Sequence, residues 1–229
     1  MGKPLISVMM PTYNNAKYIK QAIESIYAQN YDNIEIIVVD DGSTDNTKEI
    51  VQQYKDIKYF YIEHKGIPFA RNTALEKSTG EYIAFLDSDD YWLPNKLNTQ
   101  IQYFKDHPDC EIVFTKYENF FENEYVKKNK IAIFEKTSEK NNNSCLETSV
   151  VKKRVFDKCG KYNESLEFGE DTEYEYRISK NNINIKHIIN KIFYMRRLHG
   201  KNISLKRNIG LMKNFLRKFS NTLRQGIKK

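Results

Sequence analysis

Acidic residues follow two apolar segments in the first half of this sequence. Leu86–Asp90 reads LDSDD directly after the apolar run YIAF, and Val38–Thr47 reads VVDDGSTDNT. Carboxylates packed this closely repel one another, so a bound cation is one way to compensate them. Ligands that offer only oxygen suit Mg²⁺ or Mn²⁺, and such ions also bind diphosphates. The alternatives are a solvated acidic turn at LDSDD, and turn and N-cap residues at VVDDGSTDNT.

A third polar segment could contribute to nucleotide binding. PTYNN, at Pro11–Asn15, closes the first apolar run of the chain, and Tyr13 within it could stack on a base. An acid at the end of the second apolar run could accept a hydrogen bond from a uracil ring or from a ribose hydroxyl. The alternative for PTYNN is an ordinary turn between a strand and a helix.

Alternating strands and helices are predicted to position these residues. Leu5–Met10 and Ile34–Val39 read as buried strands, and the apolar residues between them recur at the three- and four-residue spacing of a helix. This pattern predicts a βαβ unit with a parallel sheet. Ligands of open α/β sheets bind where the carboxyl ends of the strands meet, so the loops after Met10, Val39 and Leu86 should form the site. The pattern continues with helices near 45–54, 68–78 and 95–105, and with strands near 59–62, 82–86 and 112–116.

The second half of the chain is less regular. We expect a variable loop over 117–144, helices over 150–159 and 171–179, and short strands over 185–189 and 192–195. A basic amphipathic helix should follow Ser204. We therefore divide the chain into a first half (1–116), a second half of the same domain (117–204) and a basic amphipathic C-terminal extension (205–229).

Charge is distributed unevenly along the 229 residues. Residues 176–229 hold 15 Lys and Arg and no acid, whereas residues 1–175 hold 22 cations against 30 acids, a net charge of −8. The tail could anchor on an anionic membrane surface, or its apolar stripe could pack on the body or on a second subunit in an oligomer. The acidic body argues against nucleic acid as a partner.

Cysteine usage and hydropathy indicate the compartment. The three cysteines form no CxxC pair, and no apolar run is long enough to span a bilayer. We expect a cytoplasmic protein that is at most peripheral on the inner face of the membrane.

Four segments, taken in order, resemble the inverting glycosyltransferases of family 2, which have the GT-A fold. They are ISVMMPTYN, VVDDGSTDNT, GIPFARNTALEKSTGEYIAFLDSDD and FGEDTEYEYRI, and the resemblance covers roughly residues 5–204. It implies an α/β fold: an open, mostly parallel nucleotide-binding sheet flanked by helices, a smaller acceptor-side subregion and a C-terminal helical tail. Residues 1–116 would then be the nucleotide-sugar-binding half, and residues 117–204 the acceptor-binding and catalytic-base half. The resemblance further implies a metal-dependent hexosyl- or N-acetylhexosaminyltransferase. Such an enzyme moves a sugar from a nucleoside-diphosphate donor, most often a UDP-sugar, to a glycan or lipid-linked acceptor in bacterial surface polysaccharide or glycoconjugate synthesis.

The resemblance also assigns roles to individual residues. A Mn²⁺ or Mg²⁺ ion would be held by Asp89, and His199, within YMRRLHGKNIS, would approach the metal or the diphosphate. Asp171 would act as the base that removes the acceptor proton, with Glu170 as its neighbour. The remaining residues would contact the nucleotide sugar: Pro11, Thr12, Tyr13, Asp41, Arg71, Asp87 and Ser88.

Plainer interpretations remain for several of these residues. Asp171 could be only a helix N-cap, and His199 could be a solvent-exposed loop residue. The other histidines lack a motif, and we interpret them as structural: His64, His107 and His187. At the level of the whole protein, the alternatives are a noncatalytic sugar-nucleotide-binding module and a nucleotidyltransferase. The intact DSDD and GED motifs favour the enzyme over the first, and the lack of a Gly-rich phosphate loop after Met10 argues against the second.

Overall fold

The structure, a computed structural model, describes residues 2–124, 145–167, 169–199 and 202. Within them, eight strands form one sheet in the order β3-β2-β1-β4-β7-β6-β8-β5. The strands are β1 (Ile6–Thr12), β2 (Ile34–Asp40), β3 (Lys58–Tyr61), β4 (Tyr82–Phe85), β5 (Tyr91–Trp92), β6 (Ile112–Phe121), β7 (Val150–Lys152) and β8 (Ile185–Leu198). The helices are α1 (Ile19–Tyr27), α2 (Thr47–Val51), α3 (Ile67–Lys77), α4 (Lys96–Asp106), the 3₁₀ helix η1 (Leu146–Thr148), α6 (Arg154–Cys159) and α7 (Glu170–Lys180).

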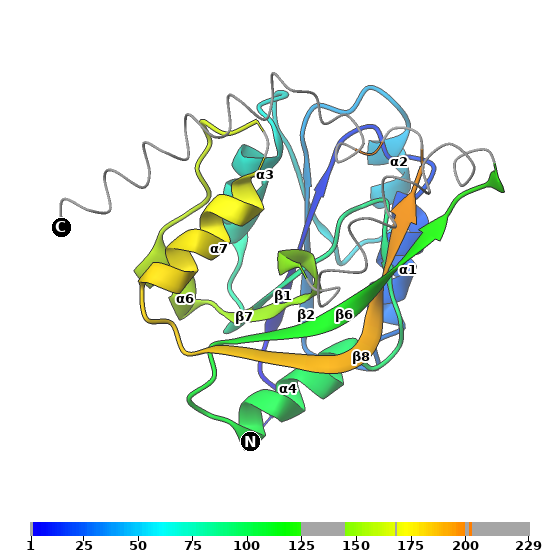
Figure 1. Ribbon diagram of the computed structural model, residues 1–229. Helices are drawn as coiled ribbons and strands as arrows, with labels where there is room; N and C mark the ends of the chain where they lie inside the picture. The colour runs from blue at the N-terminus through cyan, green and yellow to red at the C-terminus, as the bar shows by residue number, and fades with distance from the viewer. Residues whose placement is uncertain (1, 125–144, 168, 200–201, 203–229) are drawn as a thin grey trace.

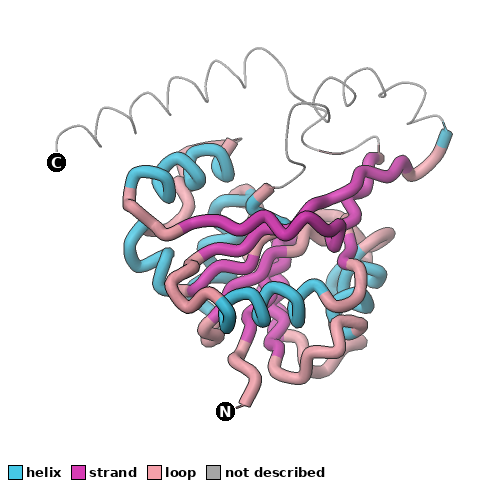
Figure 2. Tube along the Cα trace, turned by 60° about the horizontal axis from the view of Figure 1, so that its bottom comes forward, coloured by secondary structure: helices cyan, strands magenta, loops and turns pink. Residues whose placement is uncertain are grey.

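Helices cover both faces of the sheet (Figures 1 and 2). On one face, Val8 and Met10 of β1 pack in a core with residues of α1, α2 and α4. On the other face, Met9 packs in a second core with residues of α3, α6 and α7. Burial on both faces explains why the strands β1, β2 and β4 read as continuous apolar runs.

The strand directions bring the polar loops to one edge. Strands β1, β2, β3 and β4 run parallel. Strand β7 lies between β4 and β6 and is antiparallel to both, while β8 is parallel to β6. The strands β6 and β8 therefore run in the same direction as β4. As a result, the segments that follow β1, β2, β4 and β8, together with η1 just before β7, lie at the same edge.

The predicted fold class is confirmed, and the antiparallel pairs make the sheet mixed in its second half. The helix expected over 150–159 is wrong for its first residues, because Val150 and Val151 pair with β4 and β6 and only 154–159 is helical. The two short strands expected over 185–195 are one strand, β8. Strand β6 extends beyond the expected 112–116 and crosses the predicted division at 116/117.

Two predicted features lie wholly or mostly outside the described residues. These are the extension 205–229 and most of the variable loop 117–144. In the part of the chain that the structure describes, no helix has the length and apolar character needed to cross a bilayer.

Candidate active site

The acidic loop after β4 gathers three carboxylates. Asp87, Asp89 and Asp90 each offer an oxygen, and these oxygens lie within 4.8 Å of one another. Asp90 is buried, and its oxygens accept hydrogen bonds of 2.7 Å from the Tyr194 hydroxyl and from the Arg197 backbone N–H. Burial, together with the nearby Asp89 and Asp87, raises the pKa of Asp90 well above its usual range. Asp90 thus fixes the acidic loop to β8.

His199 contacts Asp89 at this edge. Its Nε2 lies 2.9 Å from Asp89 Oδ2, and its backbone N–H donates to Asn202 Oδ1 at 2.6 Å. The imidazole ring stacks on Tyr18 at a centroid distance of 5.0 Å. His199 is 5% exposed, so the alternative of a solvent-exposed loop histidine is wrong.

The donor set suits a hard divalent cation. Asp87 and Asp89 supply carboxylate oxygens, and the His199 ring nitrogen lies 2.9 Å from Asp89 Oδ2. The pKa of Asp87 is raised to about 7, chiefly by burial; Arg71 opposes the rise, and the nearby Glu147 and Asp89 add to it. A cation bound here would relieve this repulsion, and the residues present fit Mg²⁺ or Mn²⁺.

Arg71 joins the acidic loop to the start of α7. Its side chain, 4% exposed, projects from α3, which lies beside α7 in Figure 1. Nη1 donates to Glu170 Oε1 at 3.1 Å and to Asp171 Oδ1. Nη2 donates to Glu147 Oε1 at 2.9 Å and lies 3.5 Å from Asp87 Oδ1. One guanidinium therefore serves four carboxylates, and the cluster has an excess of negative charge.

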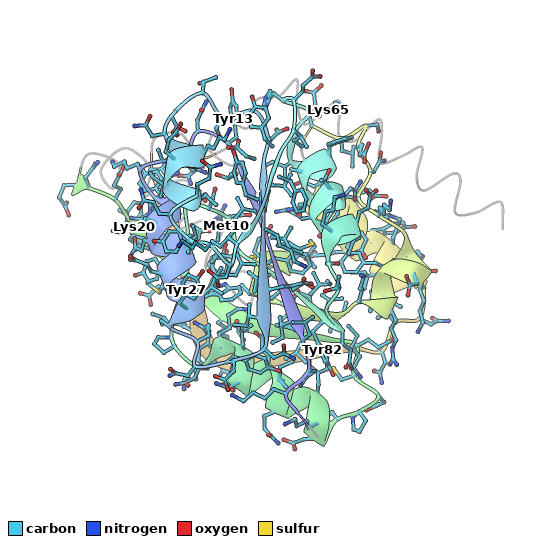
Figure 3. All side chains as sticks on the ribbon, turned by 180° about the vertical axis from the view of Figure 1, so that it is seen from behind. Met10, Tyr13, Lys20, Tyr27, Lys65 and Tyr82 are labelled. Atoms are coloured by element: carbon cyan, nitrogen blue, oxygen red, sulfur yellow. The ribbon has the colours of Figure 1, made fainter. Side chains whose placement is uncertain are left out.

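Asp41 and Tyr13 lie at the same edge. The Asp41 carboxylate accepts the backbone N–H groups of Lys65 and Gly66 at 2.7 and 2.9 Å. Tyr13 is 45% exposed, and its ring stacks on His64 at 4.2 Å. Figure 3 labels Tyr13 and Lys65 at one end of the molecule and Tyr82 at the other. Asp41 thus fixes the turn that carries His64, and Tyr13 and His64 present adjacent rings.

The remaining predicted residues connect these two parts of the site. The buried Ser88 hydroxyl accepts a 2.7 Å hydrogen bond from Asn15 Nδ2, which links PTYNN to the acidic loop. Thr12 Oγ1 is buried without a hydrogen-bond partner among the described residues, and Pro11 beside it is half-buried. The predicted site residues therefore occupy one edge of the sheet. Direct contacts join Arg71 with Asp87, Glu170 and Asp171, and Asp89 with His199.

Sequence reasoning missed several participants. His64, interpreted as structural, lies beside Tyr13 and Asp41, and its Nδ1 is 2.9 Å from an Asp41 carboxylate oxygen. Glu147 and Tyr194 also belong to the site. His64 lies in the turn after β3, and nothing in the sequence indicates that this turn folds back against Tyr13. For Glu147, which lies 76 residues from Arg71, no local signal exists.

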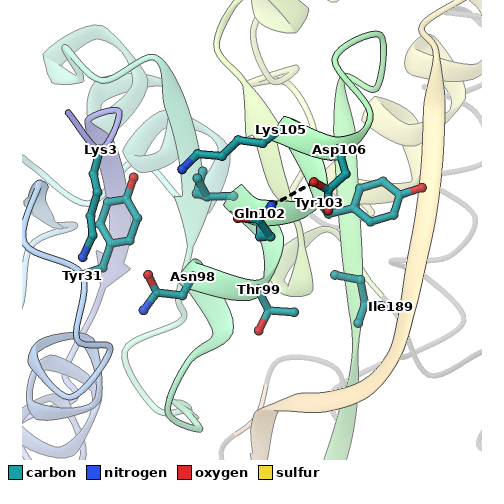
Figure 4. Close-up of a pocket in the computed structure, with 10 residues that line it drawn as sticks. Lys3, Tyr31, Asn98, Thr99, Gln102, Tyr103, Lys105, Asp106 and Ile189 are labelled. Carbon is teal, nitrogen blue, oxygen red and sulfur yellow. Dashed lines mark hydrogen bonds between the residues drawn. The ribbon is translucent and has the colours of Figure 1, made fainter. Parts of the chain in front are cut away.

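A shallow groove lies away from this site, against α4 (Figure 4). Lys3, Tyr31 and Ile189 contribute to its walls, and on α4 Gln102 donates to Asp106 at 2.9 Å. None of the predicted site residues lines it.

Known proteins resemble this chain in sequence. Two curated relatives are each 42% identical over 120 residues. They are TuaG of Bacillus subtilis (strain 168), a glycosyltransferase named for teichuronic acid biosynthesis, and WfaP of Escherichia coli, a UDP-Glc:alpha-D-GlcNAc-diphosphoundecaprenol beta-1,3-glucosyltransferase. The matches cover 50% and 51% of this chain but only 47% and 46% of the relatives, so the chain matches about half of their length.

Solved structures share the fold. Staphylococcus aureus TarS 1-349 in complex with UDP has a TM-score of 0.70 and 24% identity, and the match covers 85% of this chain and 60% of the TarS 1-349 chain. The mannosyltransferase PcManGT of Pyrobaculum calidifontis, in complex with GDP-Man and Mn²⁺, has a TM-score of 0.71 and 21% identity, covering 97% and 65%. The family description Glycosyl transferase family 2 matches residues 7–197, which is most of the chain. This chain is a member of glycosyl transferase family 2.

Proposed function

We propose that this protein transfers a sugar, with inversion, from a nucleoside-diphosphate donor to an acceptor hydroxyl. The observation that carries the proposal is the pair of contacts made by Arg71. One guanidinium reaches both Asp87 of the acidic loop and Asp171 at the start of α7. Arg71 thereby holds close together a group proposed to bind the donor and a group proposed to accept a proton.

The donor is proposed to be a UDP-sugar. Tyr13 and His64 offer ring faces for a base, and the buried Thr12 hydroxyl has no hydrogen-bond partner among the described residues. WfaP is named for UDP-Glc, and TarS has been solved with UDP and with UDP-GlcNAc, whereas PcManGT was solved with GDP-Man. These names support a nucleotide-sugar donor carrying a hexosyl or N-acetylhexosaminyl group.

Asp89, assisted by His199, is proposed to hold Mn²⁺ or Mg²⁺, with Asp87 and Ser88 on the nucleotide side. The bound ion would neutralise charge that develops on the departing diphosphate, so the chain needs no general acid there. Tyr18 and Asn202 keep the His199 ring and backbone in place.

Asp171 is proposed as the general base. It is the second residue of α7, and its side chain is 34% exposed, whereas that of Glu170 is 9% exposed and less accessible to a substrate. Burial raises the pKa of Asp171 well above its usual range; Arg71 opposes this shift, and Glu147, Glu170 and Asp87 add to it. A raised pKa makes the ionised carboxylate a stronger base, which suits the removal of a proton from a hydroxyl.

The acceptor is proposed to be a glycan or a lipid-linked sugar used in bacterial surface polysaccharide synthesis. TuaG is named for teichuronic acid biosynthesis, and the acceptor in the name of WfaP is a diphosphoundecaprenol-linked sugar. Such an acceptor is consistent with a cytoplasmic protein on the inner face of the membrane. It is also consistent with the proposed acceptor-binding half, 117–204, and with an anchoring or oligomerising extension, 205–229.

The Asp171→Asn variant tests the base assignment. Removing a general base should lower turnover about 10²–10⁴-fold, while UDP affinity in a titration stays within a few-fold of the wild-type value. The matched control is Glu173→Gln, because Glu173 lies on the same helix and is also paired with an arginine, Arg177. Turnover by Asp171→Asn within a few-fold of wild type would refute the assignment.

A further inference from the structure

Glu147 lies behind the proposed base on a segment that sequence analysis did not single out. It belongs to the 3₁₀ helix η1 at the catalytic edge, and its side chain is 11% exposed. Its Oε1 accepts the 2.9 Å hydrogen bond from Arg71 Nη2, while Nη1 of the same guanidinium contacts Asp171. Because a guanidinium is planar and rigid, the pairing on one edge sets where the other edge points.

The position of Glu147 is itself fixed from the core. Gln100 of α4 is fully buried, and its Nε2 donates to the carbonyls of Val113 in β6 and Thr148 in η1, at 2.7 and 3.1 Å. The buried Thr115 hydroxyl donates to the same Thr148 carbonyl at 3.3 Å. These bonds attach η1 to the sheet, which makes Glu147 a rigid partner for Arg71 rather than a mobile surface acid.

Tyr162 and Glu170 contact the rest of the Arg71 guanidinium. The Tyr162 ring lies 5.5 Å from its Cζ, and Glu170 accepts from Nη1 at 3.1 Å. With the other contacts in place, a change at Glu147 leaves a buried guanidinium edge without this partner. The guanidinium then loses the contact that fixes its orientation toward Asp171.

We propose that Glu147 is a positioning residue for sugar transfer: it holds Arg71 so that the Asp171 carboxylate faces the acceptor hydroxyl. This inference rests on the proposed function. It adds a residue that contacts neither donor nor acceptor and acts through Arg71. Gln100 holds η1 against the sheet, and Glu147 of η1 in turn holds the Arg71 guanidinium.

The electrostatic consequence has a definite sign. The groups that face Asp171 are Arg71 from α3, Glu147 from η1, Glu170 from its own helix and Asp87 from the acidic loop, and the three carboxylates raise the pKa of Asp171. Replacing Glu147 by glutamine removes one of these negative charges. The acidic limb of the pH profile of kcat should therefore move to lower pH in Glu147→Gln.

The experiment compares Glu147→Ala, Glu147→Gln and wild type in transfer assays with a UDP-sugar, together with titration of UDP. Glu147→Ala should lose at least tenfold in kcat, with donor KM and UDP affinity within about twofold, because only the arrangement of the base changes. Glu147→Gln keeps an acceptor oxygen for Arg71, so it should recover most of kcat and show the shifted acidic limb.

The control is Glu111→Gln. Glu111 is a buried acid at the start of β6 that pairs with Arg154 and Lys158 outside the site. Its replacement should lower thermal stability and leave kcat unchanged. If Glu147→Ala retains wild-type kcat, or if kcat and UDP affinity fall together, the positioning role is refuted while the transferase proposal stands. A wild-type protein that binds no nucleotide and transfers no sugar would instead refute the proposed function.

Discussion

Replacing Arg71 by methionine should destabilise the fold in a pH-dependent way. The variant removes a guanidinium that is 4% exposed and leaves its carboxylate partners uncompensated. Breaking a buried ion pair by removing one partner costs about 3–5 kcal/mol. Glu147 and Glu170 are largely buried, but the Asp87 and Asp171 side chains are 38% and 34% exposed, and solvent screens them. We therefore expect a loss of about 3 kcal/mol at pH 7.

The sign of the pH dependence follows from the carboxyl groups. Without Arg71, the pKa values of Asp87 and Asp171, which are already raised in the folded state, rise further, and the pKa of Glu147, which Arg71 holds down, rises as well. The stability of the variant is then retained at low pH, where these groups are protonated, and is lost as pH rises through their folded-state pKa values. The gap in unfolding free energy between wild type and variant should widen from pH 5 to pH 8.

Urea denaturation at pH 5, 7 and 8 measures this gap. The control is Arg154→Met, because Arg154 is 55% exposed and pairs with Glu111, so its loss should cost less than about 1 kcal/mol. A loss below about 1 kcal/mol for Arg71→Met, or a gap that does not change with pH, would contradict the view of Arg71 as the central cation of the site.

Two further predictions concern the sheet and the nucleoside side. Burial alone would raise the pKa of Glu35, but hydrogen bonds from Lys58, Ser7 and Thr79 lower it from 4.5 to about 2. This shift contributes about 3 kcal/mol to the stability of the folded state. The contribution is present above pH 4.5 and is lost as the pH falls to 2. Acid titration of unfolding should show this loss in wild type and not in Glu35→Gln; equal acid sensitivity would count against it. Tyr13→Ala should weaken UDP binding about tenfold through lost stacking. Tyr27→Ala, equally exposed at 45%, should not, and an unchanged UDP affinity in Tyr13→Ala would exclude stacking.

Much of the fold could be predicted because strands buried on both faces leave continuous apolar runs. Leu5–Met10 and Ile34–Val39 match β1 and β2 within two residues at each end. The helix expected at Val150 is wrong because the pairing of β7 with both β4 and β6 overrides local propensity. Contacts between distant strands carry no periodic signal, so the position of β7 in the sheet could not be read from the sequence.

Some residues of the site could likewise be predicted from the sequence, and others could not. Asp87 and Asp89 follow the end of a strand and Asp171 lies at the start of a helix, so their positions could be recognised in the sequence. The resemblance to a known family then assigned their roles. The partners supplied by other elements were invisible: Glu147 on Arg71, Tyr194 on Asp90, and His64 on Tyr13. Which acids remain open to a ligand depends on these partners, and they are fixed only by the tertiary fold.

The central claim is that acids from separate loops hold one divalent cation against a nucleoside diphosphate, and calorimetric titration of UDP with and without Mn²⁺ tests it most directly. We predict that Mn²⁺ tightens UDP binding at least tenfold in wild type and that Asp89→Asn abolishes the difference, while Asp109→Asn, at an exposed acid bonded to Asn184, retains it. Equal UDP affinities in wild type with and without Mn²⁺ would contradict the account.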